Sequence, residues 1–214
     1  MIAGIVLAAG ASRRLGRNKL LLPFRSETVL AASVARLLES AIDHVVLVLG
    51  HEADEVRARA DLPEDPRLST VKNPDWASGM ASSLRTGLAA CADAEAVIVA
   101  LGDQPGIDPA VVARLVAAFR AGAPLAVPVH PDPAAPDGER ASHPVLFGRA
   151  LFSELIALQG DTGAREIVKG RWAAAARVLG APVRDVDTEA DYAALLEERP
   201  PQKDGLVIPD ASRK

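Results

Sequence analysis

The chain has 214 residues, of which 49% are hydrophobic, and its formal net charge is −4 at pH 7. This length fits one substantial domain with a closed apolar core and is short for two. The acidic balance argues against a general attraction to nucleic acid, and no apolar run approaches the ~18 residues that a membrane span needs.

The N-terminus lacks a basic leader, and its apolar stretch is too short for the core of a signal peptide. We therefore expect a cytoplasmic protein with neither a membrane nor a nucleic acid as partner. A single cysteine, Cys91, cannot form an internal disulfide, and the four histidines show no zinc-ligand spacing. Cys91 lies in an alanine-rich stretch, where we interpret it as a small buried hydrophobe rather than a nucleophile.

The first predicted element is a buried strand over residues 2–8, followed by a loop with two glycines and a basic cluster. Glycine lets the backbone approach a polyanion, free N–H groups can form an anion-binding concavity, and Arg13, Arg14 and Lys19 add positive charge. Five residues separate Gly10 from Gly16, which fits neither a Walker loop nor a dinucleotide-binding fingerprint. We predict a phosphate-binding loop in which Lys19 is exposed; the alternative is a turn with a solvated basic face.

Apolar strand patterns alternate with amphipathic helix patterns along the rest of the chain. Further strands are predicted over 44–49, 68–72, 96–101, 124–129 and 143–148, with a weaker one near 176–186. Helices are predicted over 27–40 and 108–120, the second with Asp108-Pro109 as its N-cap and first turn. This alternation predicts an α/β fold: a single Rossmann-like (GT-A-like) domain over 1–198, with a mostly parallel central sheet flanked by helices and ligands at the carboxyl ends of the strands. Residues 199–214 are predicted to be a flexible tail.

A polar segment follows the predicted strand at 68–72. It begins with Asn73, and Gly79 and the paired serines Ser82 and Ser83 open a helix there. Backbone N–H groups and hydroxyls in this arrangement suit an anion or the edge of a nucleobase. The alternative is an N-capped helix that packs through Trp76.

Asp103 follows the buried strand at 96–101 and a glycine, so we expect it to extend from a rigid edge into the ligand crevice. One carboxylate there suits magnesium, which shares its coordination with waters and nucleotide phosphates. The alternative role is to cap the helix that begins near Pro109. Asp187 is a second candidate acid, and it could instead cap a helix from Thr188 to Glu198.

Two further regions stand out between these acids. Residues 130–142 are rich in proline and turn formers and are predicted to form an exposed, mobile loop. Gly160 and Gly163 bracket a turn before a helix, where Arg165 could hold a phosphate bidentately. His143 could face a ligand or anchor its own loop through a backbone hydrogen bond.

The first loop resembles the signature of nucleotidyltransferases built like the molybdenum-cofactor enzymes, Leu-x-x-Gly-x-Ser-x-Arg-Met-Gly-x-x-Lys. The matching positions are Leu7, Gly10, Ser12, Arg14, Gly16 and Lys19. Leu15 stands in place of the usual methionine. Segments that begin at residues 73, 142, 160 and 185 resemble further blocks of the same enzymes, so the resemblance spans nearly the whole domain. Leu-Ala-Ala-Gly at 7–10 and Gly-Asp-Gln-Pro at 102–105 resemble the cytidylyl rather than the guanylyl branch.

The resemblance implies that CTP reacts with the molybdopterin cofactor to give its cytosine dinucleotide form and pyrophosphate, with Mg²⁺ as cofactor. It also implies a molybdoenzyme or its insertion chaperone as a protein partner. The implied catalytic residues are Arg14, Lys19 and Asp103, and the implied metal ligands are Asp103 and Asp187. The implied acceptor-binding residues are His143, Asp161 and Arg165. The implied nucleotide-binding residues are Leu7, Ala8, Ala9, Gly10, Ser12, Gly16, Asn73, Gly79, Ser82 and Ser83.

Two alternative functions remain open from the sequence. A related nucleotidyltransferase could act on a sugar or another small phosphate, which would leave the segments at 142–147 and 160–165 unexplained. A non-catalytic carrier could instead bind a nucleotide or cofactor and hand it to a partner enzyme.

Overall fold

The computed structural model describes residues 1–12 and 14–197. Arg13 and the predicted tail over 199–214 lie outside the described residues. Within the described part, no helix is both long and apolar enough to cross a membrane.

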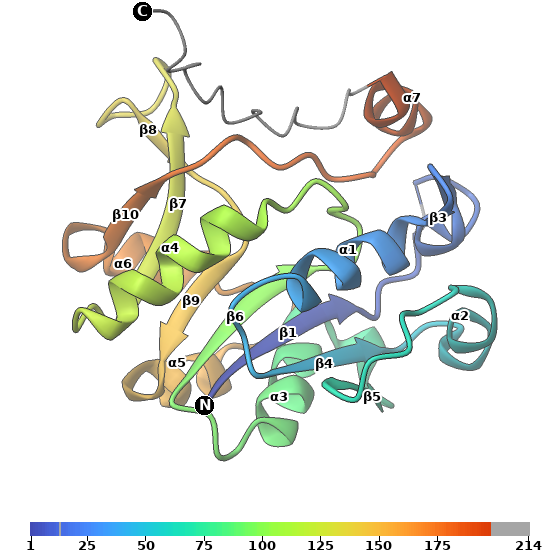
Figure 1. The fold of residues 1–214 in the computed structure, drawn as a ribbon, viewed down its shortest axis with the longest axis horizontal. Helices are drawn as coiled ribbons and strands as arrows, with labels where there is room; N and C mark the ends of the chain where they lie inside the picture. The colour runs from blue at the N-terminus through green and yellow to red at the C-terminus, as the bar shows by residue number, and fades with distance from the viewer. Residues whose placement is uncertain (13, 198–214) are drawn as a thin grey trace, which may run out of the picture.

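A mixed sheet runs through the centre of the molecule (Figure 1). Its strand order is β10-β7-β9-β6-β1-β4-β5, and β8 pairs with β7. The strands of the sheet are β1 (Ile2–Ala8), β4 (His44–Leu49), β5 (Leu68–Lys72), β6 (Ala96–Leu101), β7 (Leu125–Pro131), β8 (Glu139–Ala141), β9 (Val145–Gly148) and β10 (Ala176–Leu179). β6, β1, β4 and β5 run parallel, and β9 runs antiparallel between β6 and β7. The predicted mostly parallel sheet is confirmed.

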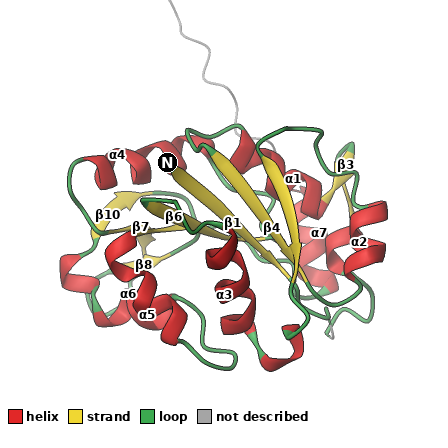
Figure 2. Cartoon of the chain, turned by 90° about the horizontal axis from the view of Figure 1, so that it is seen from below, coloured by secondary structure: helices red, strands yellow, loops and turns green. Residues whose placement is uncertain are grey.

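Helices cover both faces of this sheet. The α-helices are α1 (Val29–Leu38), α2 (Ala53–Arg59), α3 (Met80–Ala90), α4 (Pro109–Arg120), α5 (Phe152–Ala157), α6 (Arg165–Gly170) and α7 (Glu189–Glu197). Short 3₁₀ helices are η1 (Lys19–Leu21), η2 (Trp76–Ser78), η3 (Arg149–Leu151) and η4 (Trp172–Ala174). α1 and α4 lie on one face, and α3, α5 and α6 lie on the other (Figure 2).

The period-2 geometry of a strand explains why the central strands are apolar throughout. Along β1, Val6 packs into the core under α1 and α4, whereas Ile5 packs into the core beside α3. With both faces covered, neither set of side chains faces water, so no polar alternation interrupts the run. The helix ends also follow local chemistry, because Thr28 and Asp108 accept hydrogen bonds from backbone N–H groups at the starts of α1 and α4.

The order of the strands reverses beside β1. The chain passes from β1 through α1 to β4 and through α2 to β5, then returns through α3 to β6 on the other side of β1. The loops that leave β1 and β6 therefore diverge at their carboxyl ends, where open α/β sheets form their ligand crevice. This topology brings the basic loop after β1 next to Asp103 after β6.

One local prediction needs correction, and one small element was not predicted. The region 130–142 is not a single irregular loop, because His130 of β7 pairs with Arg140 of β8 in an antiparallel ladder. Its turn formers mark only the turn between these strands. A second small hairpin, β2 (Pro23–Phe24) with β3 (Glu27–Thr28), was not predicted, since two-residue strands carry no readable alternation.

Candidate active site

The loop after β1 is anchored at both ends. Leu15 is buried and packs in a small separate core with Leu22, Val29 and Val186. Ser12 Oγ accepts a hydrogen bond from the backbone N of Lys19 at 3.2 Å, which ties the start of the loop to η1. The loop is therefore held while its basic side chains face the crevice.

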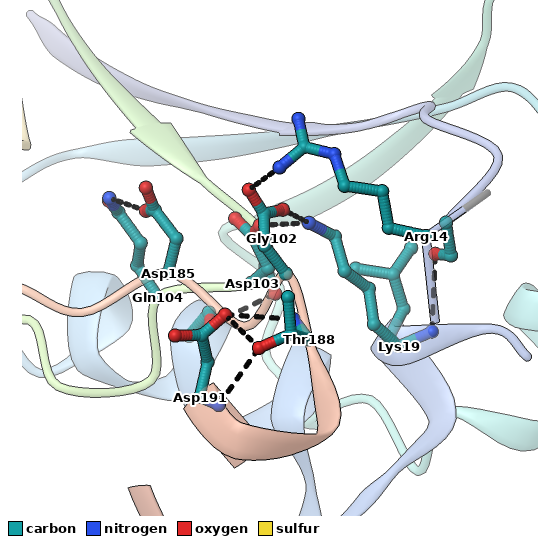
Figure 3. Close-up of polar contacts among 12 residues, drawn as sticks. Arg14, Lys19, Gly102, Asp103, Gln104, Asp185, Thr188 and Asp191 are labelled. Carbon is teal, nitrogen blue, oxygen red and sulfur yellow. Dashed lines mark hydrogen bonds and ion pairs between the residues drawn. The ribbon is translucent and has the colours of Figure 1, made fainter. Parts of the chain in front are cut away.

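Four charged side chains meet between β1, β6 and the C-terminal segment (Figure 3). Lys19 Nζ donates to Asp103 Oδ2 and, at 2.9 Å, to Asp187 Oδ1. Arg14 Nη1 donates to the other oxygen of Asp187 at 2.8 Å. The sequence thus correctly selects Arg14, Lys19, Asp103 and Asp187 as residues that lie together, although it could not give their pairing.

The prediction that Lys19 is exposed is wrong. Its side chain is only 18% exposed, because the loop folds back and places the lysine between two carboxylates. Arg14 is 75% exposed and covers the cluster from the solvent side.

The structure also decides against helix capping by the two acids. Thr188 caps α7 instead of Asp187: Thr188 Oγ1 accepts from the backbone N of Asp191, and the Asp191 carboxylate accepts from the backbone N of Thr188 at 2.8 Å. Asp108 caps α4, so Asp103 has no capping role there. Both acids are free to face the crevice.

Burial and charge shape the ionisation of this cluster. Burial raises the pKa of the Asp103 carboxyl, although the charge and hydrogen bond of Lys19 oppose the shift. Burial lowers the pKa of Lys19, but its interactions with Asp103 and Asp187 outweigh burial, so the net shift is upward and the ammonium stays charged. The hydrogen bond from Lys19 lowers the pKa of Asp187, and the nearby charge of Arg14 acts in the same direction. Lys19 therefore favours the charged form of Asp103 against the effect of burial.

Asp103 and Asp187 are the two carboxylates of this cluster that could hold a divalent metal. In residues 1–12 and 14–197, no group of three or more His, Cys, Asp or Glu side chains is placed to hold a metal ion by itself. Asp103 and Asp187 nevertheless already bind one common cation, the Lys19 ammonium. Magnesium usually takes one or two carboxylates and fills its remaining positions with water and phosphate oxygens. The donor set therefore suits a metal that arrives with a polyphosphate.

A pocket opens directly beside this cluster. Its walls come from the end of β1, the loop after it, η2, α3 and the end of β6, and are formed by Leu7, Ala8, Ala9, Gly10, Lys19, Leu20, Trp76, Gly79, Met80, Ser83, Leu101, Asp103 and Asp161. A continuation toward the loop includes Ser12, Arg14 and Asp187. Most of the predicted nucleotide-binding residues line one of these two hollows, so they are brought together.

Asn73 and the paired serines form a buried support rather than an open surface. Asn73 Nδ2 donates to Ser82 Oγ at 2.8 Å and to Ser83 Oγ at 3.0 Å, and Asn73 Oδ1 accepts from the backbone N of Asp75. Of these three side chains, Ser83 reaches the pocket. Asn73 and Ser82 thus hold the start of α3 in place beside it.

A second pocket begins at Gln104, the residue after Asp103. Its polar walls are formed by Gln104, His130, Arg140, Ser142, His143, Arg165 and Asp185. Gln104 is 2% exposed, and its amide nitrogen donates to the Asp185 carboxylate. Burial lowers the pKa of His143, although the carboxylates of Asp185 and Asp103 oppose the shift.

The structure divides the predicted acceptor residues between the two pockets. His143 and Arg165 line the second pocket, whereas Asp161 lines the first, beside Gly79. Two adjacent residues separate the pockets, because Asp103 lines the first pocket and Gln104 lines the second. The C-terminal segment repeats the pattern, because Asp187 lies by the first pocket and Asp185 lines the second.

Sequence reasoning missed several lining residues. His130 and Arg140 belong to the hairpin that was predicted as a mobile loop, and only their cross-strand pairing places them at the second pocket. Trp76 enters the sequence analysis only through the alternative of a packed helix, and the structure places it in the wall of the first pocket. Asp185 had a readable signal, since it belongs to the same acidic segment as Asp187, but only the structure places the two carboxylates at different pockets.

The doubly wound sheet and the basic loop at its switch point define a nucleotide-binding α/β protein. The chain matches the MobA-like NTP transferase domain over residues 4–178 and belongs to that family of nucleotidyltransferases. Asp185 and Asp187 lie beyond the matched range.

Individual relatives carry different activities in their names. The nicotine blue oxidoreductase of Paenarthrobacter nicotinovorans is 38% identical over 170 residues, which cover 78% of this chain and 81% of that protein. The molybdenum cofactor cytidylyltransferase of Escherichia coli K12 is 24% identical over 189 residues, which cover 88% and 92%. Among solved structures, Rv0371c of Mycobacterium tuberculosis H37Rv in complex with manganese is 34% identical, with a TM-score of 0.73 and coverage of 92% of this chain and 99% of that chain. These comparisons establish the family. Because the relatives differ in the activities that their names state, the comparisons do not identify the substrate of this chain.

Proposed function

We propose that this chain is a magnesium-dependent cytidylyltransferase that transfers CMP from CTP to the terminal phosphate of the molybdopterin cofactor and releases pyrophosphate. The observation that carries the proposal is the convergence of Arg14, Lys19, Asp103 and Asp187 at the first pocket and the hollow beside it, while their neighbours Gln104 and Asp185 line the second pocket. Nucleotidyl transfer needs in-line placement of two substrates, a metal, and cations for the charge that develops on the leaving group.

The first pocket and the loop beside it would bind the nucleotide. Glycine backbone and the Ser83 side chain line the inner part, and Arg14 and Lys19 border the outer part, where a triphosphate would lie. These two cations would stabilise the negative charge that builds up on the β- and γ-phosphates as pyrophosphate leaves. Asp103 and Asp187 would hold magnesium, which supplies further neutralisation of the phosphates when bound.

The second pocket would bind the acceptor. Arg140 and Arg165 give it positive charge, and His143 and Gln104 offer neutral polar groups. An acceptor phosphate is already ionised near neutral pH, so the transfer needs no strong general base. One of its oxygens forms a bond to the α-phosphorus of CTP as the bond between the α-phosphorus and the bridging oxygen breaks, and pyrophosphate departs with that electron pair.

The choice of cytosine and of molybdopterin is supported by resemblance. Residues 7–10 and 102–105 read as in the cytidylyl branch of the family, and a relative named molybdenum cofactor cytidylyltransferase covers 88% of this chain. Ala9 lines the nucleotide pocket, at the position where the guanylyl branch tends to carry glycine.

Pyrophosphate release tests the proposal directly. Purified protein, magnesium and molybdopterin should release pyrophosphate with CTP and much less with GTP, ATP or UTP. Asp103→Asn should abolish most of this release, whereas Asp54→Asn, an exposed carboxylate paired with Lys72, should leave it unchanged. No release with any nucleotide, in the presence of an acceptor shown to be active with another enzyme, would refute the proposal.

The same experiment separates the alternatives. A carrier would retain its ligand after Asp103→Ala and would release no pyrophosphate. A nucleotidyltransferase for sugars or other small phosphates would release pyrophosphate with those acceptors and not with molybdopterin.

A further inference from the structure

The Lys19 ammonium occupies the place between Asp103 and Asp187. It donates to one oxygen of each carboxylate, and Arg14 holds the second oxygen of Asp187. An ammonium and a divalent cation seek the same oxygens, so a metal cannot take these positions while the lysine holds them.

The charges in the cluster also balance. Two cations, Arg14 and Lys19, face two carboxylates, Asp103 and Asp187, so the cluster as a whole has little attraction for a free dication. Asp103 is mostly buried and Lys19 holds its Oδ2, so a metal that takes this oxygen must replace the lysine.

We propose that Lys19 is an internal counter-cation that keeps divalent metal off Asp103 and Asp187 until the triphosphate of a nucleotide draws it away. The chain then takes up the metal together with the nucleotide rather than as a free ion. This inference rests on the proposed function, because it concerns the same two carboxylates as metal ligands.

The surroundings of Lys19 allow this exchange. Its side chain borders both the nucleotide pocket and the hollow beside the loop, so phosphates bound there would lie within reach of the ammonium. Lysine carries a compact charge on a flexible stem, and moving from carboxylate to phosphate replaces one anionic partner with another. Arg14 is exposed, so its side chain can also move from Asp187 to the same phosphates.

Binding of Mn²⁺ to the nucleotide-free protein tests the inference, with free Mn²⁺ measured by electron paramagnetic resonance. Lys19→Met should bind Mn²⁺ at least about tenfold more tightly than the unaltered protein, since it removes one competing positive charge and keeps the length of the side chain. Arg17→Met is the matched control. It removes a positive charge from the same loop, but Arg17 pairs with Glu189 and not with the two acids.

Affinity in Lys19→Met that equals or falls below that of the unaltered protein would overturn the inference. So would an equal gain in Arg17→Met, because the cause would then be the general charge of the loop. Absence of Mn²⁺ binding in every variant would overturn the metal role of the two acids as well. Should Lys19→Met fail to fold, Lys19→Gln gives the same comparison. The assay contains neither CTP nor acceptor. A result that overturns the inference about Lys19 therefore does not decide the outcome of the pyrophosphate-release test of the proposed function.

Discussion

Replacement of Gly79 by alanine should destabilise the protein far more than the same change at two other glycines of the nucleotide pocket and its loop. Gly79 has φ 110° and ψ 175°, a combination that is essentially restricted to glycine. A Cβ there would lie 2.3 Å from the carbonyl carbon and oxygen of Gly160 and 2.6 Å from the backbone N of Asp161. The loop at 160–161 would have to move.

The cost follows from two terms. Backbone strain at this φ and ψ is about 1–3 kcal/mol. Displacement of the loop would also break the 3.0 Å hydrogen bond from the backbone N of Ala81 to the carbonyl of Gly160, at about 0.5–1.5 kcal/mol. We expect a total loss of about 2–4 kcal/mol in the free energy of unfolding, or roughly 5–15 °C in Tm for a chain of this size.

Gly16 and Gly10 provide graded controls. Gly16 has φ +69° but open space around it, so Gly16→Ala should cost only about 1 kcal/mol. Gly10 has open space and no positive φ, and Gly10→Ala should be close to neutral. Urea denaturation followed by circular dichroism gives all three values. Equal losses at Gly79 and Gly10 would refute the reasoning, because they would show that neither strain nor the Gly160 contact matters.

Further predictions concern the helix cap, the cysteine and the histidine. Thr188→Ala should lose about 1 kcal/mol of stability, whereas Asp187→Asn should lose little stability and most pyrophosphate release; the opposite ranking by urea denaturation would restore Asp187 as the cap. Burial raises the pKa of the Cys91 thiol to about 11, so a thiol reagent at pH 8 should label it only after unfolding, and rapid labelling of the native protein would contradict this. The pKa of His143 is lowered by burial from its ordinary value of 6.5, so the unfolded chain takes up this proton first as pH falls. The free energy of unfolding should therefore decrease as pH falls below about 6.5, and it should decrease less in the His143→Gln variant. Equal slopes of urea midpoint against pH in the two proteins would contradict this role of His143.

The sheet was largely predictable because its strands are decided locally. The predicted strands over 2–8, 44–49, 68–72 and 96–101 match β1, β4, β5 and β6, whose unbroken apolar runs reflect burial on both faces. The predicted helix over 108–120 matches α4, since Asp108-Pro109 marks its start. Where the structure depends on a distant partner, the prediction was weaker: His130 and Arg140 lie in a ladder that their own sequence does not reveal.

The candidate site shows the same division. Position after a strand was enough to select Lys19 and Asp103 as neighbours, because the ends of parallel strands meet at one edge. Burial of Lys19 was not predictable, since the lysine lies between Asp103 and Asp187, and Asp187 is 168 residues further along the chain. The roles of Asp187 and Thr188 could not be separated from sequence either, because both residue types cap helices and only the geometry shows which one does.

The late position of Asp187 has a consequence for the growing chain on the ribosome. The basic loop and β6 are synthesised well before the segment over 185–191, which forms no hydrogen-bonded pairing with strands β1, β4, β5 or β6. Until that last segment emerges, Lys19 lacks one of its two carboxylates and Thr188 has not begun α7. All four of these strands therefore leave the ribosome before Asp187, and the charged cluster can be completed only after that residue has been synthesised.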